Sequence, residues 1–273
     1  MVFVGIVTCN REDFFKKCYD SVKSSIGVDY IAVVNDGKSD VNVDKDDIYI
    51  KNKVNLGVGK SKNTLFREAF KLKKQGKDIQ HIFIIEDDIV MKDPNVFNEY
   101  IKARNITGIQ HFCFAYHGPA NKNGISGGKP CPRYIIDYGN SKISINTHSV
   151  GAFCYYTTEV LEKVGLIDEN FHNAFEHVEH SYRIAKEGYT TPYWNWADLA
   201  NSMDLLDEIQ CSEQSSTIRP RKDWKDNIIK GASLFQRKHG YSPAWQNAVP
   251  DTSEKDVKET MKNIFKKFAR NSP

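Results

Sequence analysis

The chain has 273 residues, of which 27% are charged and 40% are hydrophobic, and its formal net charge at pH 7 is +3. This length fits one large domain, or one domain with an appendage, and is sufficient to bury a sizeable core. The small net charge gives no strong signal for nucleic-acid binding, and no segment approaches the run of about 20 apolar residues that crosses a bilayer.

The first residues, MVFVGIVTCNRED, have neither the basic start nor the small-residue cleavage site of a signal peptide, and they are typical of a first strand. The six cysteines, at positions 9, 18, 113, 131, 154 and 211, lack Cys-x-x-Cys or zinc-type spacing. This pattern favours reduced, structural thiols. We therefore expect a cytoplasmic protein.

Strand-like and helix-like segments alternate through the first 90 residues. Apolar runs of four to seven residues predict strands, and apolar residues at helical spacing predict helices. The strands are expected at Val2–Thr8, Tyr30–Asn35, Asp47–Lys51 and Ile82–Ile85, and the helices at Glu12–Ser24 and Val58–Lys74. Because such alternation needs crossover connections, the sequence predicts an α/β fold with a mainly parallel sheet flanked by helices.

The pattern becomes mixed after Pro94. Strands are expected at Ile109–Ala115 and Gly151–Tyr156, a hairpin at Tyr134–Asp137 and Lys142–Ile145, and helices at Thr158–Val164 and His177–Lys186. Residues 118–133 are rich in Gly, Pro and Asn, which predicts a long exposed loop. Loops of this length beside a rigid sheet are commonly lids or binding loops.

The chain after Leu205 is more polar. A weakly structured stretch at residues 208–222 leads to predicted helices at Trp224–His239 and Ser253–Arg270. In the last helix apolar residues share one face and lysines occupy the other. We expect the apolar face to dock onto its own domain. Peripheral contact with a membrane, an anionic partner or a second copy in a dimer are the alternatives.

The segment Ile82–Val90, IFIIEDDIV, ends a buried strand in three consecutive carboxylates, Glu86, Asp87 and Asp88. Such a strand brings its charged end to the carboxyl edge of the sheet, where open α/β folds bind ligands. Clustered carboxylates there favour Mg²⁺ or Mn²⁺, held together with a ligand's phosphates. A solvated turn or a helix start is the alternative interpretation.

Polar segments follow four of the predicted strand ends. They are Thr8–Arg11, Asn35–Gly37, Asn55–Asn63 and Glu86–Asp88. Each alone is an ordinary turn or cap, and Gly57 and Gly59 match neither the dinucleotide fingerprint nor a Walker loop. Since the four would meet at one edge of the sheet, together they indicate a nucleotide site.

These segments, in this order, resemble the family 2 type glycosyltransferases of the GT-A fold over about residues 1–200. The matching pieces include VVNDGKSD, NLGVGKSKN, IIEDDIV in place of the family's Asp-x-Asp motif, GAFCYYTTEVLEKVGLIDENF, and FEHVEHSYRIAKEGY in place of Glu-Asp-x-Asp-x-x-x-Arg. The resemblance implies a GT-A (Rossmann-like) domain at 1–204, with a nucleotide-sugar half at 1–90 and an acceptor half at 91–204. A C-terminal helical extension follows at 205–273.

The resemblance implies an inverting, metal-dependent glycosyltransferase. Its donor is a nucleotide diphosphate sugar, foremost a UDP-sugar, and its acceptor is a hydroxyl of a glycan, a lipid-linked glycan or another molecule. The donor-binding residues carried over from the family are Thr8, Asn10, Arg11, Asp36, Asn55, Gly57, Lys62, Glu86 and Asp87. Within this set Asp36 is implied to contact the base or ribose, and Lys62 corresponds to a basic position near the donor.

The resemblance also implies a bound Mn²⁺ or Mg²⁺. Asp88 is the principal metal ligand, and Asp87 either joins it or, with Glu86, holds the ribose and sugar. Asp198 in WADLANS is a further candidate, at a place where relatives often carry a histidine.

The sequence departs from the family at the catalytic motif. The family's Glu-Asp pair is Glu176-His177 here, and the next Asp is Glu179. Relatives use the aspartate of the pair as the general base. His177 can accept a proton near neutral pH, and Glu176 or Glu179 are alternatives for the same role. A purely structural role, in which these side chains cap and solvate the helix, is the other interpretation.

Two other functions are compatible with this kind of sheet. A nucleotidyltransferase that makes sugar nucleotides is one, although such enzymes carry a glycine-rich loop that is absent after the first strand. A non-catalytic nucleotide-sugar binding module is the other, because the family's catalytic Asp is missing. Tyr193, Trp194 and Trp196 fit either an acceptor-binding surface or the core.

Overall fold

A computed structural model describes residues 1–123, 128–209, 216–243 and 253–270. Its central sheet has six strands in the order β3-β2-β1-β4-β9-β6. These are β3 (Ile48–Lys51), β2 (Tyr30–Asn35), β1 (Val2–Thr8), β4 (His81–Glu86), β9 (Phe153–Thr157) and β6 (His111–Cys113). The first four run parallel, and β9 runs antiparallel to both of its neighbours. The expected α/β class, with a mainly parallel sheet, is confirmed.

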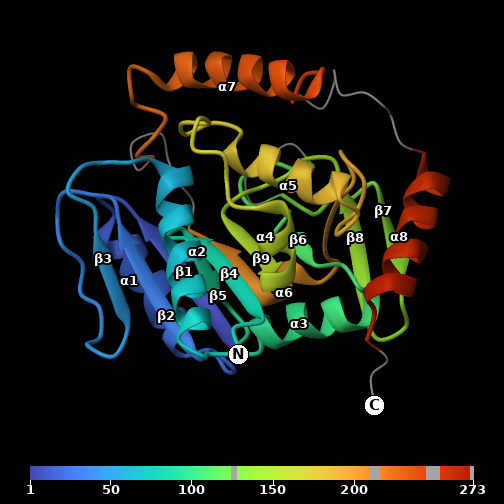
Figure 1. Cartoon of the computed structure of the whole chain (residues 1–273), viewed down its shortest axis with the longest axis horizontal. Helices are drawn as coiled ribbons and strands as arrows, with labels where there is room; N and C mark the ends of the chain where they lie inside the picture. The colour runs from blue at the N-terminus through green and yellow to red at the C-terminus, as the bar shows by residue number, and fades with distance from the viewer. Residues whose placement is uncertain (124–127, 210–215, 244–252, 271–273) are drawn as a thin grey trace.

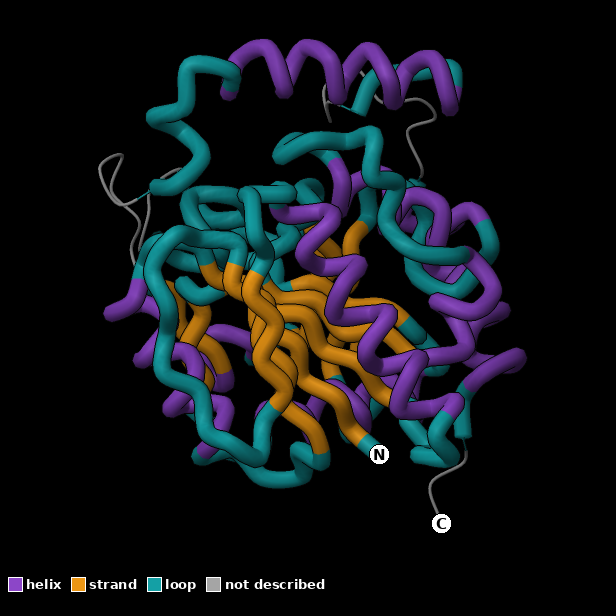
Figure 2. The backbone as a smooth tube through the Cα atoms, turned by 60° about the vertical axis from the view of Figure 1, so that its left-hand side comes forward, coloured by secondary structure: helices purple, strands orange, loops and turns teal. Residues whose placement is uncertain are grey.

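Helices cover both faces of this sheet (Figure 2). Side chains of β1 alternate between the two faces: Val4 and Ile6 pack in one apolar core with α1 (Glu12–Lys23) and α3 (Val96–Thr107). Phe3 and Val7 pack in a second core with α2 (Val58–Lys74), α4 (Thr158–Val164) and α5 (Glu176–Lys186). A strand enclosed in this way has no polar face, which explains the continuous apolar runs of β1 and β4.

Two smaller sheets complete the strand structure. The predicted hairpin, β7 (Tyr134–Asp137) and β8 (Lys142–Asn146), is confirmed and is extended by β10 (Trp196–Leu199). The chain after Glu86 turns into β5 (Ile89–Met91), which pairs with β11 (Leu206–Glu208) just beyond the short helix α6 (Ser202–Leu205). The sequence did not predict β5, β10, β11, α3 or α6 as separate elements.

The two C-terminal helices lie on the outside of the molecule (Figure 1). The last helix, α8 (Glu254–Phe268), buries Val257, Met261 and Ile264 against the domain and contacts α3. Docking of this helix onto its own chain is therefore confirmed. The other, α7 (Trp224–His239), lies across α5 and begins where the sequence predicts.

Several expectations for the second half are now settled. Tyr193, Trp194 and Trp196 are only 8%, 7% and 3% exposed and pack around Phe235 of α7, so they are core residues rather than an acceptor surface. The loop expected at 118–133 is not uniformly exposed. Asn121 and Lys122 are buried, and their side chains donate hydrogen bonds to the Ala115 carbonyl and to Glu208. Residues 124–127 of that loop lie outside the described residues, as do 210–215 of the stretch expected to be weakly structured.

The cysteines at positions 9, 18, 113, 131 and 154 are free thiols, as expected, whereas Cys211 lies outside the described residues. In the described part of the chain, no helix is both long and apolar enough to cross a membrane.

Candidate functional site

A cleft of about 450 Å³ lies at the carboxyl ends of β1 and β4, the position expected for a ligand in this class of fold. The predicted site residues that line it are Thr8, Arg11, Glu86, Asp87, Asp88, Glu176 and His177. The predicted residues that lie behind or away from it are Asn10, Asp36, Asn55, Gly57, Lys62, Glu179 and Asp198. The cleft therefore joins the acidic end of β4 to the start of α5.

Arg11 binds both aspartates at the end of β4. Its guanidinium contacts the Asp87 carboxylate, and its Nη1 donates to Asp88 Oδ2 at 3.1 Å. Thr8 Oγ1 donates to the other Asp87 oxygen at 2.6 Å. Burial raises the pKa of Asp87 to about 6, against the lowering effect of Arg11. Both oxygens of Asp87 are thus already engaged by the protein.

Asp88 is different because one of its carboxylate oxygens forms no hydrogen bond. The Oδ1 atom is buried and has no hydrogen-bond partner, and His117 Nε2 lies 3.6 Å away, too far for a hydrogen bond. Burial would raise the pKa of Asp88, but His117 and Arg11 together lower it to about 2. Asp88 is therefore ionised and keeps one oxygen without a hydrogen bond. Among the residues that the structure describes, no group of three or more His, Cys, Asp or Glu side chains is arranged to hold a metal ion.

Lys62 is buried behind the lining of the cleft. It is only 2% exposed, and its ammonium donates to Glu86 Oε1 and to the Gly151 carbonyl, each at 2.7 Å. Burial alone would lower the pKa of Lys62, yet the carboxylates of Glu86 and Glu176 raise it above its ordinary value. Lys62 therefore stays charged and ties α2 to the end of β4 and to the segment before β9.

Asp36 organises the loop in front of α2. It accepts hydrogen bonds from the Asn55 side chain and from the backbone amides of Leu56 and Gly57, at 2.8 to 2.9 Å. Gly57 has φ of +87°, and a Cβ there would lie 2.7 Å from Asn173 Oδ1, so glycine is required on both counts. In this structure Asp36, Asn55 and Gly57 shape the wall behind the cleft.

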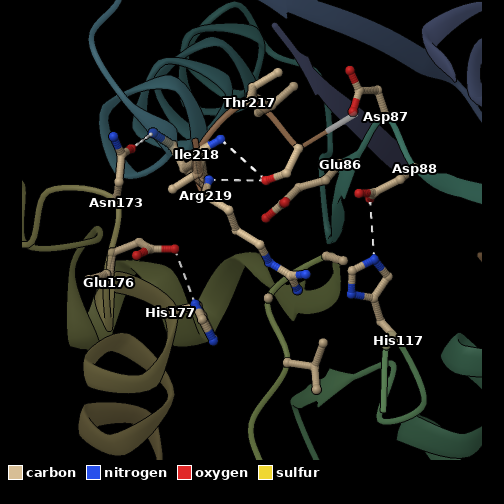
Figure 3. Close-up of a pocket in the computed structure, with 18 of the residues that line it drawn as sticks. Glu86, Asp87, Asp88, His117, Asn173, Glu176, His177, Thr217, Ile218 and Arg219 are labelled. Atoms are coloured by element: carbon tan, nitrogen blue, oxygen red, sulfur yellow. Dashed lines mark hydrogen bonds and ion pairs between the residues drawn. The ribbon is translucent and has the colours of Figure 1, made fainter. Parts of the chain in front are cut away.

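Glu176 and His177 begin α5 and form a pair on the opposite side of the cleft from Asp88 (Figure 3). Glu176 Oε1 and His177 Nδ1 are 3.1 Å apart. Despite burial, His177 and Lys62 lower the pKa of Glu176 to about 2, and Glu176 raises the pKa of His177. A Cβ at Gly151 would lie 2.7 Å from the His177 ring, so only glycine allows this approach.

Glu179 faces away from the cleft, toward α7. Its carboxylate is completely buried and accepts hydrogen bonds from Arg183 on its own helix, and from Lys238 and His239 on α7, at 2.8 to 3.2 Å. Together with the Phe235 cluster, this contact joins α7 to α5. The structure therefore places Glu179 in a helix-to-helix contact and not beside Glu176 and His177.

Asp198 on β10 is also fully buried and does not line the cleft. It accepts hydrogen bonds from the Tyr100 hydroxyl at 2.7 Å, the Ala115 amide at 2.9 Å and the Ser202 hydroxyl at 2.6 Å. Burial raises the pKa of Asp198 to about 6. Its hydrogen bonds hold β10, α3 and the end of β6 together, which is a structural task.

Sequence reasoning missed several cleft residues. His117 follows the predicted strand Ile109–Ala115, so its position just past a strand end could have indicated it. Residues 216–219 and Trp224, from the C-terminal extension, also line the cleft, but their polar, aperiodic stretch carried no signal. Figure 3 shows the Arg219 side chain extending into the cleft between the Glu176–His177 pair and the acidic end of β4.

Comparisons with known proteins rest on structure alone. No family model matches the sequence, and no curated protein matches it. Among solved structures, residues 1–349 of S. aureus TarS in complex with UDP match with a TM-score of 0.55 and 11% identity, over 97% of this chain and 70% of that chain. The expected GT-A fold is confirmed. At this identity the likeness shows the fold and nothing finer.

Two other solved structures match with lower TM-scores. The mannosyltransferase PcManGT from Pyrobaculum calidifontis, in complex with GDP-Man and Mn²⁺, gives 0.46 at 13% identity, over 70% of this chain and 54% of that chain. The catalytic domain of Drosophila β1,4-galactosyltransferase 7, in complex with xylobiose, gives 0.48 at 14% identity, over 82% and 77%. This chain thus spans about half the length of the mannosyltransferase chain.

Proposed function

We propose that the protein is an inverting glycosyltransferase that moves a sugar from a nucleotide diphosphate donor, foremost a UDP-sugar, to a hydroxyl of a glycan or lipid-linked acceptor. The observation that carries this proposal is one cleft with the acidic end of β4 on one side and the Glu176–His177 pair on the other. The fold that the chain shares with the UDP complex of TarS supports UDP as the nucleotide.

The donor would bind along the carboxyl ends of β1 and β4. Its base and ribose would lie near Thr8 and the loop that Asp36 organises, and its diphosphate would lie toward Arg11 and Arg219. A leaving diphosphate gains negative charge in the transition state, so fixed cations beside it lower the barrier. The Arg219 side chain is exposed and lines the cleft, so it can contact an anionic donor.

The residues present fit a divalent cation of the expected kind, Mn²⁺ or Mg²⁺. Mg²⁺ is commonly held by one or two carboxylates together with substrate phosphates. The ionised Asp88 Oδ1, which forms no hydrogen bond and lies 3.6 Å from His117 Nε2, offers such a ligand. When bound there, the ion would supply positive charge to the diphosphate. We do not include Asp198 as a ligand, because its oxygens are engaged in the core.

His177 is the proposed general base. Its Nδ1–H would donate to Glu176 Oε1, which keeps the lone pair on Nε2 for the acceptor proton. The acceptor oxygen would bond to the anomeric carbon as the bond from that carbon to the diphosphate breaks. The proton passes to His177 Nε2, and the Glu176 carboxylate stabilises the resulting imidazolium. Attack and departure on opposite faces invert the anomeric configuration.

A donor screen tests this proposal. UDP-, GDP- and CMP-sugars are titrated calorimetrically with and without Mn²⁺, and nucleotide release is followed for the wild type, Asp88→Asn and His177→Gln. We expect metal-dependent binding of one donor, lost binding in Asp88→Asn, and retained binding with release at least about 100-fold slower in His177→Gln. Asp204→Asn, the same chemical change at an exposed site, is the matched control. Absence of binding by every donor would refute the proposal.

A further inference from the structure

A second cavity, of about 160 Å³, lies at the amino end of β4, opposite the end that forms the functional cleft. It is lined by His81, the first residue of β4, whereas the functional cleft is at Glu86, the last. The ends of two helices that contact each other, α3 and α8, bring Arg104 and Arg270 to this cavity. Nothing proposed above for the cleft uses these residues.

Arg104 is an unusual side chain for its position. It is only 4% exposed, yet within the described residues it pairs with no carboxylate. Its Nη1 donates to Asn105 Oδ1 at 3.1 Å, and its buried Nε has no partner. A buried guanidinium normally pairs with an anion, because removing its charge from water is costly. Of these two guanidinium donors, Nη1 has a hydrogen-bond partner and Nε has none.

A second arginine, the exposed Arg270, lies at the same cavity. Arg270, whose amide donates to the Asn105 carbonyl at 2.9 Å, also forms no ion pair with the described residues and lies close enough to lower the pKa of Arg104, after burial. Burial, the amino terminus and these two arginines lower the pKa of His81 to about 4, so His81 is neutral and adds no charge.

Acidic residues line the same cavity, and Glu159 raises the pKa of Arg104, against the effect of burial. Asp78, Glu159 and Glu162 are exposed on its rim, and Glu162 already pairs with Lys73. None of the three comes within ion-pair distance of Arg104.

We propose that Arg104 and Arg270 form a binding site for a small tetrahedral oxyanion, a phosphate, phosphate monoester or sulfate group. The volume holds about five water molecules at roughly 30 Å³ each, which suits such a group, and the guanidinium fork matches its oxygens. Bound there, the anion bridges α3 to the end of α8 and strengthens the docking of the last helix.

The test is thermal unfolding of the full chain at constant ionic strength, with chloride replaced by inorganic phosphate, sulfate or glycerol phosphate. We expect the melting temperature of the wild type to rise by about 2–4 °C at ten times Kd for the preferred anion. The three anions distinguish free inorganic ions from a phosphate monoester. Saturating UDP should leave the effect in place, because the functional cleft is a separate site. An effect abolished by UDP, or no effect with any of the three, would overturn the proposal.

Variants separate binding from folding. Arg104→Met should weaken the anion at least roughly tenfold, while its stability in chloride should equal or exceed that of the wild type, since an unpaired buried charge is removed. A loss of stability in chloride equal to the loss in phosphate would instead make Arg104 a structural residue. Arg270→Gln should weaken binding without changing stability in chloride, and Arg237→Gln, an exposed arginine on α7, should leave binding unchanged. Glu159→Gln should strengthen it by about two- to fivefold. Unchanged binding in both Arg104→Met and Arg270→Gln refutes the site, and this outcome is independent of whether the protein transfers sugars.

Discussion

Replacing Glu179 with glutamine distinguishes a catalytic role from the helix-to-helix contact that the structure shows. The substitution keeps the shape of the side chain but removes the negative charge, which accepts hydrogen bonds from Arg183, Lys238 and His239. Because Glu179 is completely buried, the substitution leaves Arg183 without its carboxylate partner, whereas Lys238 keeps Asp168 at 2.7 Å. Breaking a buried ion pair costs about 3–5 kcal/mol. The expected fall in melting temperature is therefore about 6–20 °C for a chain of this size class.

The assay is urea unfolding followed by tryptophan fluorescence, with nucleotide release measured in parallel. Lys238→Met is the matched comparison, because it removes one partially exposed donor and should cost only about 1 kcal/mol. We expect Glu179→Gln to lose more stability than Lys238→Met. If Glu179→Gln changed the free energy of unfolding by less than about 1 kcal/mol and slowed nucleotide release a hundredfold, the structural assignment would be refuted and Glu179 would be the base.

Three more predictions follow from individual contacts. Lys62→Met leaves Glu86 and the Gly151 carbonyl without their donor, and because Glu86 is partly exposed we expect a loss of about 2–3 kcal/mol in urea unfolding. If His177 is the base, the rate falls in acid through a pKa above that of free histidine, and Glu176→Gln moves this limb of the pH–rate profile to lower pH; an unmoved limb would contradict the pairing. Burial lowers the pKa of His111 to about 4, whereas the unfolded chain binds that proton below about pH 6.5. Its contribution to stability is complete above pH 6.5 and is lost as the pH falls toward 4, by about 3 kcal/mol in total, and His111→Gln should remove this part of the pH dependence.

The first half of the fold was predictable because its signals are local. The strands from Val2 to Glu86 and the helix at Val58–Lys74 each carry a continuous apolar run or a helical apolar face, and the structure places them within one or two residues of the prediction. The strand Trp196–Leu199 and the helix Val96–Thr107 were missed for a common reason. Both are buried by distant partners, and the helix includes Arg104 and Thr107 among its buried positions, which weakens its apolar pattern.

The site residues divide in the same way, into those that the sequence could predict and those that it could not. Thr8, Arg11 and the carboxylates of β4 meet in the cleft because parallel strands end at one edge of a sheet, so their convergence follows from the order of elements. The segments that contain Asp36 and Lys62 were associated with a nucleotide site by their places at strand ends, and the role of each residue was implied by the resemblance. In the structure both form internal hydrogen bonds. Asp36 accepts from backbone amides of the loop before α2, and Lys62 donates to Glu86. Residue type and spacing cannot tell a residue that lines a cleft from one that supports it.

The C-terminal part of the chain also contributes residues to the cleft. Residues 216–219 reach the cleft because α7 is held on α5 by Phe235 and by the contacts of Lys238 and His239 with Glu179. The helix that presents Glu176 and His177 is thus also the helix that anchors the segment carrying Arg219. A change that loosens α7 should therefore weaken donor binding as well as stability, even though no α7 residue beyond Trp224 lines the cleft.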